Sequence, residues 1–219
     1  MSGTAIDAPD HDHDHDHEVD EHAPQTLGDG AAPPSEFELT SRALQELLQE
    51  QGLLTADQVR RYMEALEDEY PQRGSQVVAR AWVDPEFKRL LLEDGKAACA
   101  VMGIPVGSRL IAVENTPDEH NVIVCTLCSC YPRDLLGTPP TWYKSDNYRS
   151  RVVHEPRAVL QEFGTVIPDD VTVRVHDSNA DMRYVVVPMR PAGTDGWSEE
   201  QLAAILSRDT LVGVALPSA

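Results

Sequence analysis

Basic residues are scarce in this 219-residue sequence. It has 18 Lys and Arg against 37 Asp and Glu, a formal net charge of −19, and no stripe or dense cluster of Lys and Arg. Nucleic-acid binding needs such a positive surface, so we expect no nucleic-acid partner. No apolar run approaches the roughly 18 residues that a membrane span requires, so we expect no membrane association either. The N-terminus is acidic and lacks the apolar core of a signal peptide, which predicts a cytoplasmic protein.

Cysteines are also few, and their spacing is the most informative feature of the chain. Three of the four lie within six residues, at Cys125, Cys128 and Cys130, directly after the apolar run 122–124. A strand would therefore deliver three sulfurs into one tight turn. Thiolates held this close repel one another, so they need a cation or oxidation to be tolerated. The spacing predicts a metal-binding segment, which we call the cysteine loop (residues 125–130).

Other interpretations of the cysteine loop remain open on spacing alone. A structural zinc site usually has four ligands in two separated pairs, and no second Cys/His pair lies nearby in the sequence. Cys125 and Cys128 form a Cys-x-x-Cys pair, typical of a thiol redox module, although a third cysteine follows and no helix begins after the pair. A metal-storage or delivery protein is the third interpretation. It would combine the cysteine loop with the alternating His and Asp of residues 11–17.

Composition divides the chain into three expected parts, with an α+β fold overall. Residues 1–34 are rich in Asp, His, Gly and Pro and poor in apolar side chains, which predicts a disordered acidic tail. Residues 35–103 have helical periodicity but little apolar surface per helix, so we expect a helical arm that packs on a partner subunit. Residues 104–219 alternate strands with helices. They predict a layered catalytic domain in which a mixed or antiparallel sheet carries the cysteine loop.

Periodicity and capping residues predict the individual elements. The expected helices cover 35–52, 55–71, 74–81, 84–102 and 148–163, with Pro156 interrupting the fifth, and a last helix begins at Ser198. The expected strands cover 110–113, 121–124, 171–175 and 184–187.

The segment around the three cysteines resembles a known metal motif. Residues 124–132 read VCTLCSCYP, which is similar to the metal-binding motif of the nitrile hydratase α subunit, and Thr126 is the residue type of the cobalt rather than the iron variety. The resemblance extends over most of residues 35–216. Further blocks that resemble the family follow one another in order at Ala81–Lys88, Val113–Pro117, Pro139–Lys144, Tyr148–Val153 and Arg183-Tyr184.

The resemblance implies a specific metal centre. One low-spin trivalent ion per chain, Co(3+) in preference to Fe(3+), would be bound by the sulfurs of Cys125, Cys128 and Cys130. Deprotonated backbone amides of Ser129 and Cys130 would complete the protein ligands. Cys128 would be oxidised to a sulfinic acid and Cys130 to a sulfenic acid, states that lie on the ordinary oxidation ladder of cysteine. The sixth position would stay open for a small nitrile or water.

The resemblance also implies further site residues and partners. Cys128, Cys130 and Asp177 would be the catalytic residues, and Asp177 would belong to a proton network near the metal. Arg183 would lie next to the metal ligands without binding the metal itself. The sulfenate oxygen of Cys130 would act as nucleophile or as base. One or more β-type subunits would complete the active site, and a metallochaperone or activator would deliver the metal.

Two positions depart from the family pattern. Most nitrile hydratases have Trp after Cys-Tyr-Pro, where this chain has Arg133, and a Gln near the position of Val106. Both residues would line the substrate pocket, and an arginine there favours an anionic or strongly polar substrate. The γ subunit of thiocyanate hydrolase also has this arginine and a similar His/Asp-rich tail. Glu114–Pro117 and Pro139-Pro140 follow the hydratase pattern, so nitrile hydratase is our main prediction and thiocyanate hydrolase the alternative.

Overall fold

The computed structural model describes residues 36–219 of the chain. The predicted tail of residues 1–34, including the His/Asp alternation, lies outside the described residues. The chain divides into two compact units, one ending at Glu50 and the other running from Gln51 to Ala219. The elements are α1 (Glu36–Glu50), α2 (Ala56–Asp68), α3 (Tyr70–Val83), α4 (Pro85–Glu93), α5 (Gly95–Val101), β1 (Arg109–Glu114), β2 (Glu119–Val124), α6 (Arg133–Leu136), α7 (Thr141–Lys144), α8 (Asp146–Arg151), α9 (Pro156–Glu162), β3 (Thr172–Asp177), β4 (Met182–Val187), α10 (Glu199–Ala204) and α11 (Arg208–Val212).

Helix α1 is the described part of the first unit. Its leucines recur at helical spacing, which produces an amphipathic helix, and Leu39, Leu44 and Leu47 are exposed, as is Phe37. Apolar side chains at this spacing normally pack against another surface. The prediction that residues 35–103 form an arm for a partner subunit therefore remains a proposal.

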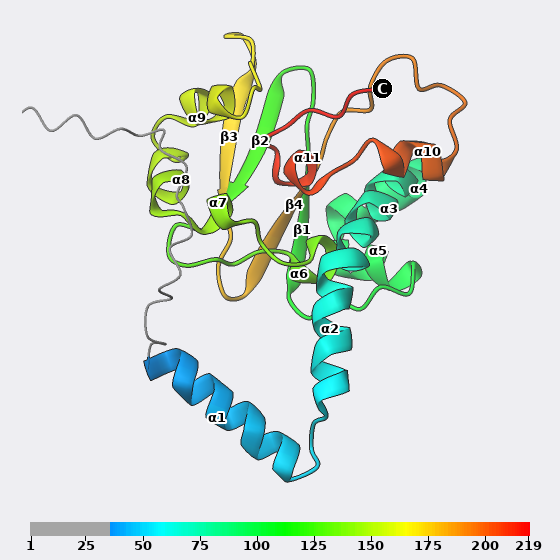
Figure 1. Ribbon diagram of the computed structural model, residues 1–219. Helices are drawn as coiled ribbons and strands as arrows, with labels where there is room; N and C mark the ends of the chain where they lie inside the picture. Colours follow the sequence, from blue (N-terminus) through cyan, green and yellow to red (C-terminus); the bar gives the residue numbers. More distant parts are fainter. Residues whose placement is uncertain (1–35) are drawn as a thin grey trace, which may run out of the picture. The chain divides into compact units, whose positions relative to one another are not determined.

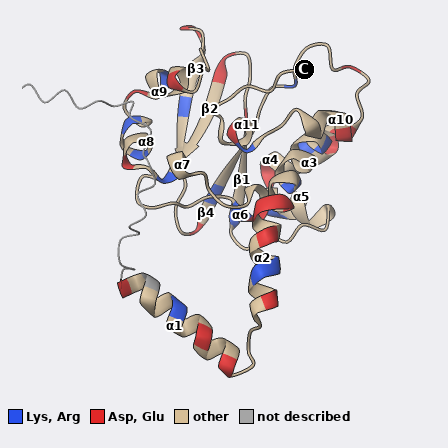
Figure 2. Cartoon of the chain, in the orientation of Figure 1, with Lys and Arg blue, Asp and Glu red and all other residues tan. Residues whose placement is uncertain are grey.

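The second unit begins with helices whose caps match the sequence prediction. Thr55 and Gln58 form a reciprocal capping box at the start of α2. Asp84 accepts hydrogen bonds from the amides of Glu86 and Phe87 at the start of α4, where Pro85 occupies the first helical turn. A second capping box, formed by Ser198 and Gln201, starts α10. Acidic and basic residues are spread along the exposed helices (Figure 2).

Two of the predicted helices are divided in the structure. The helix expected over 84–102 is broken at Asp94, whose extended backbone ends α4 and whose carboxylate caps α5 through the amide of Ala97. The helix expected over 148–163 is split into α8 and α9, with Pro156 at the first turn of α9. A proline in that position lacks the amide hydrogen that would continue the preceding helix.

The four strands pair in parallel, which corrects the expected mixed or antiparallel sheet. Strand β1 pairs with β4, and β2 pairs with β3, in two two-stranded sheets. Residues 122–124 and 185–187 are completely buried. Parallel strands are typically covered on both faces and so read as continuous apolar runs rather than as alternating patterns. The apolar runs at residues 122–124 and 185–187 are such a pattern. The predicted α+β combination of helices and strands is confirmed.

Helices cover the strands on two sides (Figure 1). Helices α4 and α5 pack on β1, α9 packs on β3, and α11 packs on β4 and β2. Helices α3 to α5 therefore share one hydrophobic core with the strands that carry the cysteine loop. Among the helices of residues 36–219, none is long and apolar enough to cross a membrane.

Candidate metal centre

Strand β2 delivers the cysteine loop to the surface of the second unit. Val124 is the last strand residue, and its carbonyl accepts a hydrogen bond of 2.7 Å from the amide of Ser178, which follows β3. Cys125 is still completely buried, whereas Cys128 is exposed and Cys130 is partly exposed. The loop therefore starts in the core and turns outward, so it can hold a ligand between the protein interior and solvent.

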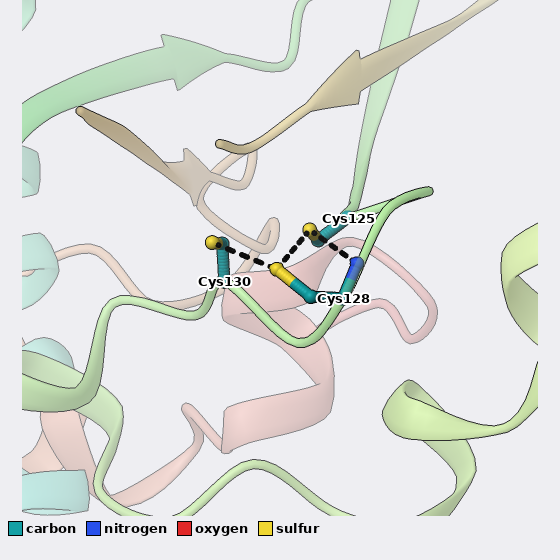
Figure 3. Close-up of side chains that lie close together, drawn as sticks. All are labelled: Cys125, Cys128 and Cys130. Carbon is teal, nitrogen blue, oxygen red and sulfur yellow. Dashed lines mark hydrogen bonds between the residues drawn. The ribbon is translucent and has the colours of Figure 1, made fainter. Parts of the chain in front are cut away.

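The three sulfurs converge on one point (Figure 3). The Sγ atom of Cys128 lies 3.4 Å from that of Cys125 and 3.3 Å from that of Cys130. All three ligand atoms lie within 4.8 Å of one another. The amide of Cys128 donates to the Cys125 sulfur at 3.3 Å, so backbone as well as side chains turns toward the centre of the loop.

The ionisation of these thiols shows why a cation suits the loop. Hydrogen bonds from Cys130 and then Cys125 lower the pKa of Cys128, and the backbone amides of Ser129 and Cys130 act in the same direction. Burial raises the pKa of the Cys130 thiol to about 12, while the nearby charge of Arg183 opposes that rise. The surroundings thus shift the pKa values of Cys128 and Cys130 in opposite directions. Three soft sulfur donors with inward-facing amides fit a transition-metal ion that would allow all three to ionise.

Asp177 fixes the turn of the cysteine loop. It is the last residue of β3 and pairs in register with Val124, so both strands end at the same edge. One carboxylate oxygen accepts from the amide of Thr126 at 3.0 Å, and the other accepts from the Thr126 hydroxyl at 2.6 Å. This two-point contact joins the loop to the end of the neighbouring strand.

Two buried tyrosine hydroxyls donate to main-chain carbonyls, one at the end of the cysteine loop and one within β2. The hydroxyl of Tyr143, in α7, donates to the carbonyl of Cys130 at 2.9 Å. The hydroxyl of Tyr148, in α8, donates to the carbonyl of Ile123 in β2 at 2.7 Å. Tyr143 was not identified from the sequence as a contact of the cysteine loop. Such a contact could have been anticipated on chemical grounds, because a buried tyrosine hydroxyl needs a hydrogen-bond partner.

The remaining predicted site residues differ in their surroundings. Arg183 donates to the carbonyls of Asn179 and Met182 and lies close enough to act on Cys130. Arg133 begins α6 and is exposed. Val106 is buried in the hydrophobic core. The two segments that contain Arg133 and Val106 do meet, because the carboxylate of Asp134 accepts from the amide of Gly107 at 2.8 Å.

A second polar cluster lies at the opposite end of β2, and we call it the turn network: Asn115, His120, Asn121 and His176. The side-chain amide of Asn115 lies 3.1 Å from His120 Nδ1, and His120 Nε2 lies 2.7 Å from the carbonyl of Gly213. A neutral His120 that donates from Nε2 and accepts at Nδ1 satisfies both contacts. Burial lowers the pKa of His120, which favours this neutral form.

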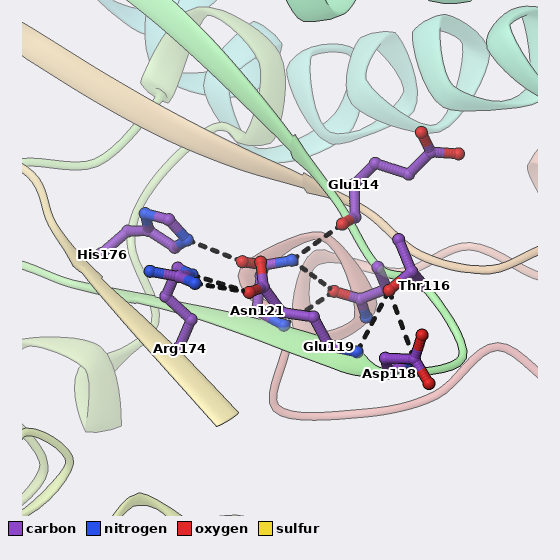
Figure 4. Close-up of polar contacts among 8 residues, drawn as sticks. Glu114, Thr116, Asp118, Glu119, Asn121, Arg174 and His176 are labelled. Carbon is purple, nitrogen blue, oxygen red and sulfur yellow. Dashed lines mark hydrogen bonds and ion pairs between the residues drawn. The ribbon is translucent and has the colours of Figure 1, made fainter. Parts of the chain in front are cut away.

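Asn121 connects the turn network to β3. Its backbone amide donates to Asn115 Oδ1 at 2.7 Å, its side-chain amide donates to the carbonyl of Glu114, and its Oδ1 lies 2.7 Å from His176 Nε2 (Figure 4). Gly213 closes the other side with φ of 91°, and a Cβ atom there would collide with the carbonyl of Asn121. Each described polar group of the network thus has a partner.

Comparison with known proteins identifies one family model and several similar subunits. Residues 35–215 match the protein family described as nitrile hydratase, alpha chain. The chain is 51% identical over 183 residues to the cobalt-containing nitrile hydratase subunit alpha of Pseudonocardia thermophila, covering 81% of this chain and 90% of the relative. It is 45% identical over 196 residues to thiocyanate hydrolase subunit gamma of Thiobacillus thioparus, covering 84% and 81%. It also superposes on an Fe-type nitrile hydratase variant from Comamonas testosteroni Ni1 with a TM-score of 0.77 and 42% identity, covering 86% and 93%.

Proposed function

This chain belongs to the nitrile hydratase alpha-chain family, and we propose that it is the metal-binding subunit of a heteromeric nitrile hydratase that adds water to a nitrile to form an amide. The observation that carries the proposal is the convergence of the Cys125, Cys128 and Cys130 sulfurs within 4.8 Å. Neither a lone redox pair nor a structural zinc site needs this arrangement of three adjacent sulfurs.

The cysteine loop has the donors that a trivalent cobalt ion needs. We assign the three sulfurs and the amides of Ser129 and Cys130 as its ligands, with one ion per chain. The amides support this assignment because they already interact with the Cys128 sulfur. Cobalt rather than iron is favoured because relatives at 47–51% identity are named as cobalt-containing subunits. When bound, such an ion supplies Lewis acidity that polarises the nitrile carbon.

Residues of this chain would position the metal centre, and one of them would take part in activating the water. We propose that an external oxidant such as dioxygen, which accepts the electrons and supplies the added oxygen atoms, converts Cys128 to the sulfinic acid and Cys130 to the sulfenic acid, whose oxygen serves as nucleophile or base. Both carboxylate oxygens of Asp177 contact Thr126, so Asp177 supports the site through the geometry of the loop. Arg183 supplies positive charge near Cys130, where an oxidised anionic sulfur would need it.

A β-type subunit completes the proposed site. The tip of the cysteine loop is open, since Cys128 is exposed and the Leu127 side chain is 83% exposed. The amphipathic α1, within the proposed arm of residues 35–103, offers a second contact surface, and residues 104–219 would form the catalytic domain. We further propose a metallochaperone that loads the ion, and a cytoplasmic location, where free thiols persist.

Thiocyanate hydrolysis is the second candidate function, and Arg133 is the observation that favours it. Its exposed guanidinium follows the cysteine loop directly and would attract an anionic substrate such as thiocyanate. A 45% identical relative is a thiocyanate hydrolase subunit. Val106, buried nearby, would then shape the pocket through its backbone rather than its side chain.

One preparation tests these alternatives together. The assembled complex should contain one cobalt per chain, should show added oxygens on Cys128 and Cys130 by mass spectrometry, and should convert an aromatic nitrile to its amide. Carbonyl sulfide and ammonia from thiocyanate, with no nitrile turnover, would favour the second candidate. An active preparation without cobalt or iron would contradict both. Several loosely held divalent ions would instead indicate metal storage, and a reversible Cys125–Cys128 disulfide without metal would indicate a redox module.

A further inference from the structure

The hydroxyl of Tyr143 is a buried polar group that donates a hydrogen bond to the cysteine loop. The Tyr143 side chain is completely buried, and its hydroxyl donates to the Cys130 carbonyl at 2.9 Å. A buried hydroxyl without a partner is costly, so this bond cannot be given up without destabilising the chain. The acceptor belongs to the last residue of the cysteine loop rather than to a helix or strand.

The ring of Tyr143 has little freedom to move. It packs edge to face against Tyr131 at a centroid distance of 4.9 Å and against Trp142 at 5.9 Å, and it lies 5.8 Å from Tyr148. Aromatic pairs at these distances favour a defined relative orientation. The hydroxyl is therefore held in place by the core and not by the loop that it contacts.

The same hydroxyl bonds to the last residue of the cysteine loop and lies near the first. Burial raises the pKa of Tyr143, the nearby Cys125 adds to that rise, and a hydrogen bond with Ser178 opposes it. Cys125 is the first residue of the loop and Cys130 the last. Ser178 in turn donates its amide to the carbonyl of Val124, just before the loop. Tyr143 thus lies where the two ends of the loop come together.

We propose that Tyr143 is a positioning residue for the metal centre: its hydroxyl fixes the peptide between Cys130 and Tyr131, and so sets where the Cys130 sulfur lies relative to those of Cys125 and Cys128. The inference rests on the proposed function. Rotation of this peptide would change the ψ torsion of Cys130, and the preceding residues that place its sulfur and amide would have to adjust to keep the loop closed. Groups that orient ligands in this way commonly change metal affinity or activity by about 10–100-fold when they are removed.

Tyr148 provides a matched control within the same aromatic cluster. It is also buried, and its hydroxyl also donates to a main-chain carbonyl, but that carbonyl belongs to Ile123 inside β2. Tyr143→Phe and Tyr148→Phe each remove one buried hydroxyl bonded to main chain. They should lower the melting temperature by similar amounts, because the lost interactions are alike. Only Tyr143→Phe removes a hydrogen bond to the cysteine loop.

The test uses the assembled, cobalt-loaded enzyme and three measurements: the visible absorption of the cobalt–sulfur centre, the rate of cobalt loss to a chelator, and kcat separately from KM. Y143F should shift the absorption, lose cobalt about 10–100-fold faster and lower kcat with little change in KM. Y148F should match the wild type within about twofold in all three. An unchanged spectrum and cobalt release rate in Y143F would overturn the inference, as would equal changes in both variants.

A second variant covers the case in which Y143F does not assemble. Ser178→Ala removes the other group that acts on the hydroxyl while the tyrosine ring stays in place. It should shift the absorption band in the same direction by a smaller amount, and no shift would count against the positioning role. Failure of the proposed function is distinguishable, because it would appear in the wild-type enzyme itself, either as absence of cobalt or as cobalt binding without nitrile turnover.

Discussion

The cysteine loop and the turn network lie at opposite ends of the same strand, β2, and they differ in how well their polar groups are satisfied. In the turn network, neutral amide and imidazole groups exchange hydrogen bonds of 2.7–3.1 Å around His120 and Asn121. In the cysteine loop, the sulfurs contact mainly one another, and full ionisation would place negative charges 3.3–3.4 Å apart. One cluster is complete within this chain, whereas the other needs something added.

This difference separates a structural cluster from a functional one. A buried network whose members all have partners stabilises one conformation and offers no free group for chemistry. Closely spaced thiols with opposed pKa shifts in Cys128 and Cys130 retain the capacity to bind and react. Mutations in the cysteine loop should therefore alter activity more than stability, and mutations in the turn network should do the reverse.

Loss of one sulfur should have the largest effect. Cys130→Ala removes a proposed ligand and the proposed sulfenate, so turnover should fall by several orders of magnitude and cobalt content should drop, with the fold retained. Cys99→Ala is the matched control, because Cys99 is buried in the core outside the loop. Cys99→Ala should keep cobalt and activity and only lower the melting temperature. Wild-type turnover in Cys130→Ala would refute the proposed mechanism.

Weakening the anchor of the loop should have the next largest effect. In Asp177→Ala, both acceptor oxygens are removed, so both contacts to Thr126 are lost. We expect cobalt affinity or kcat to fall by about 10–100-fold with a small change in melting temperature. Asp181→Ala, at an exposed position near the same strand end, should have no effect on either. Equal behaviour of the two variants would show that Asp177 does not hold the loop.

Mutations in the turn network should affect stability more than activity. Asn115→Ala removes partners of His120 and of the Asn121 amide, which leaves buried groups unsatisfied. We expect the free energy of unfolding to fall by about 2 kcal/mol, while kcat of the folded enzyme stays near the wild-type value. Asn147→Ala, at an exposed position in α8, is the control and should be close to neutral. A large loss of kcat in folded Asn115→Ala would remove the distinction between the clusters.

The sequence could predict the chemistry of the cysteine loop because ligands close in sequence are necessarily close in space. Cys125, Cys128 and Cys130 come together whatever the rest of the chain does. The cap at Asp84 was likewise predictable, since it depends on residues within one helical turn. Local patterns of this kind do not require knowledge of the tertiary fold.

Contacts between distant segments were much less predictable. The parallel pairing of β2 with β3 joins segments separated by four short helices, and only that register brings Asp177 to Thr126. The contact of Tyr143 with Cys130 depends in the same way on how α7 packs against the loop. Composition and periodicity describe each segment separately, so they could not determine which of these side chains meet.

The smallest predicted effect is a pH dependence of stability that belongs to the turn network. Burial lowers the pKa of His120 below its ordinary value of 6.5, and the bond to Gly213 opposes this only in part. Below pH 6.5 the unfolded chain therefore binds a proton that the folded chain resists, so the free energy of unfolding should decrease as the pH falls. The slope from one such group is at most about 1.4 kcal/mol per pH unit.

His120→Gln should isolate this contribution. The variant should be less stable than the wild type at pH 7, because the hydrogen bonds of the His120 ring to Asn115 and Gly213 are lost or distorted. Its free energy of unfolding should nevertheless fall less steeply between pH 6.5 and 5. Some slope should persist, since burial also lowers the pKa of His176. His154→Gln, at an exposed position, should leave the wild-type slope unchanged. Thermal denaturation of the assembled protein across this pH range measures all three. An unaltered slope in His120→Gln would mean that the acid sensitivity arises elsewhere, and the turn network would then lose its assignment as a cluster held together by a neutral histidine.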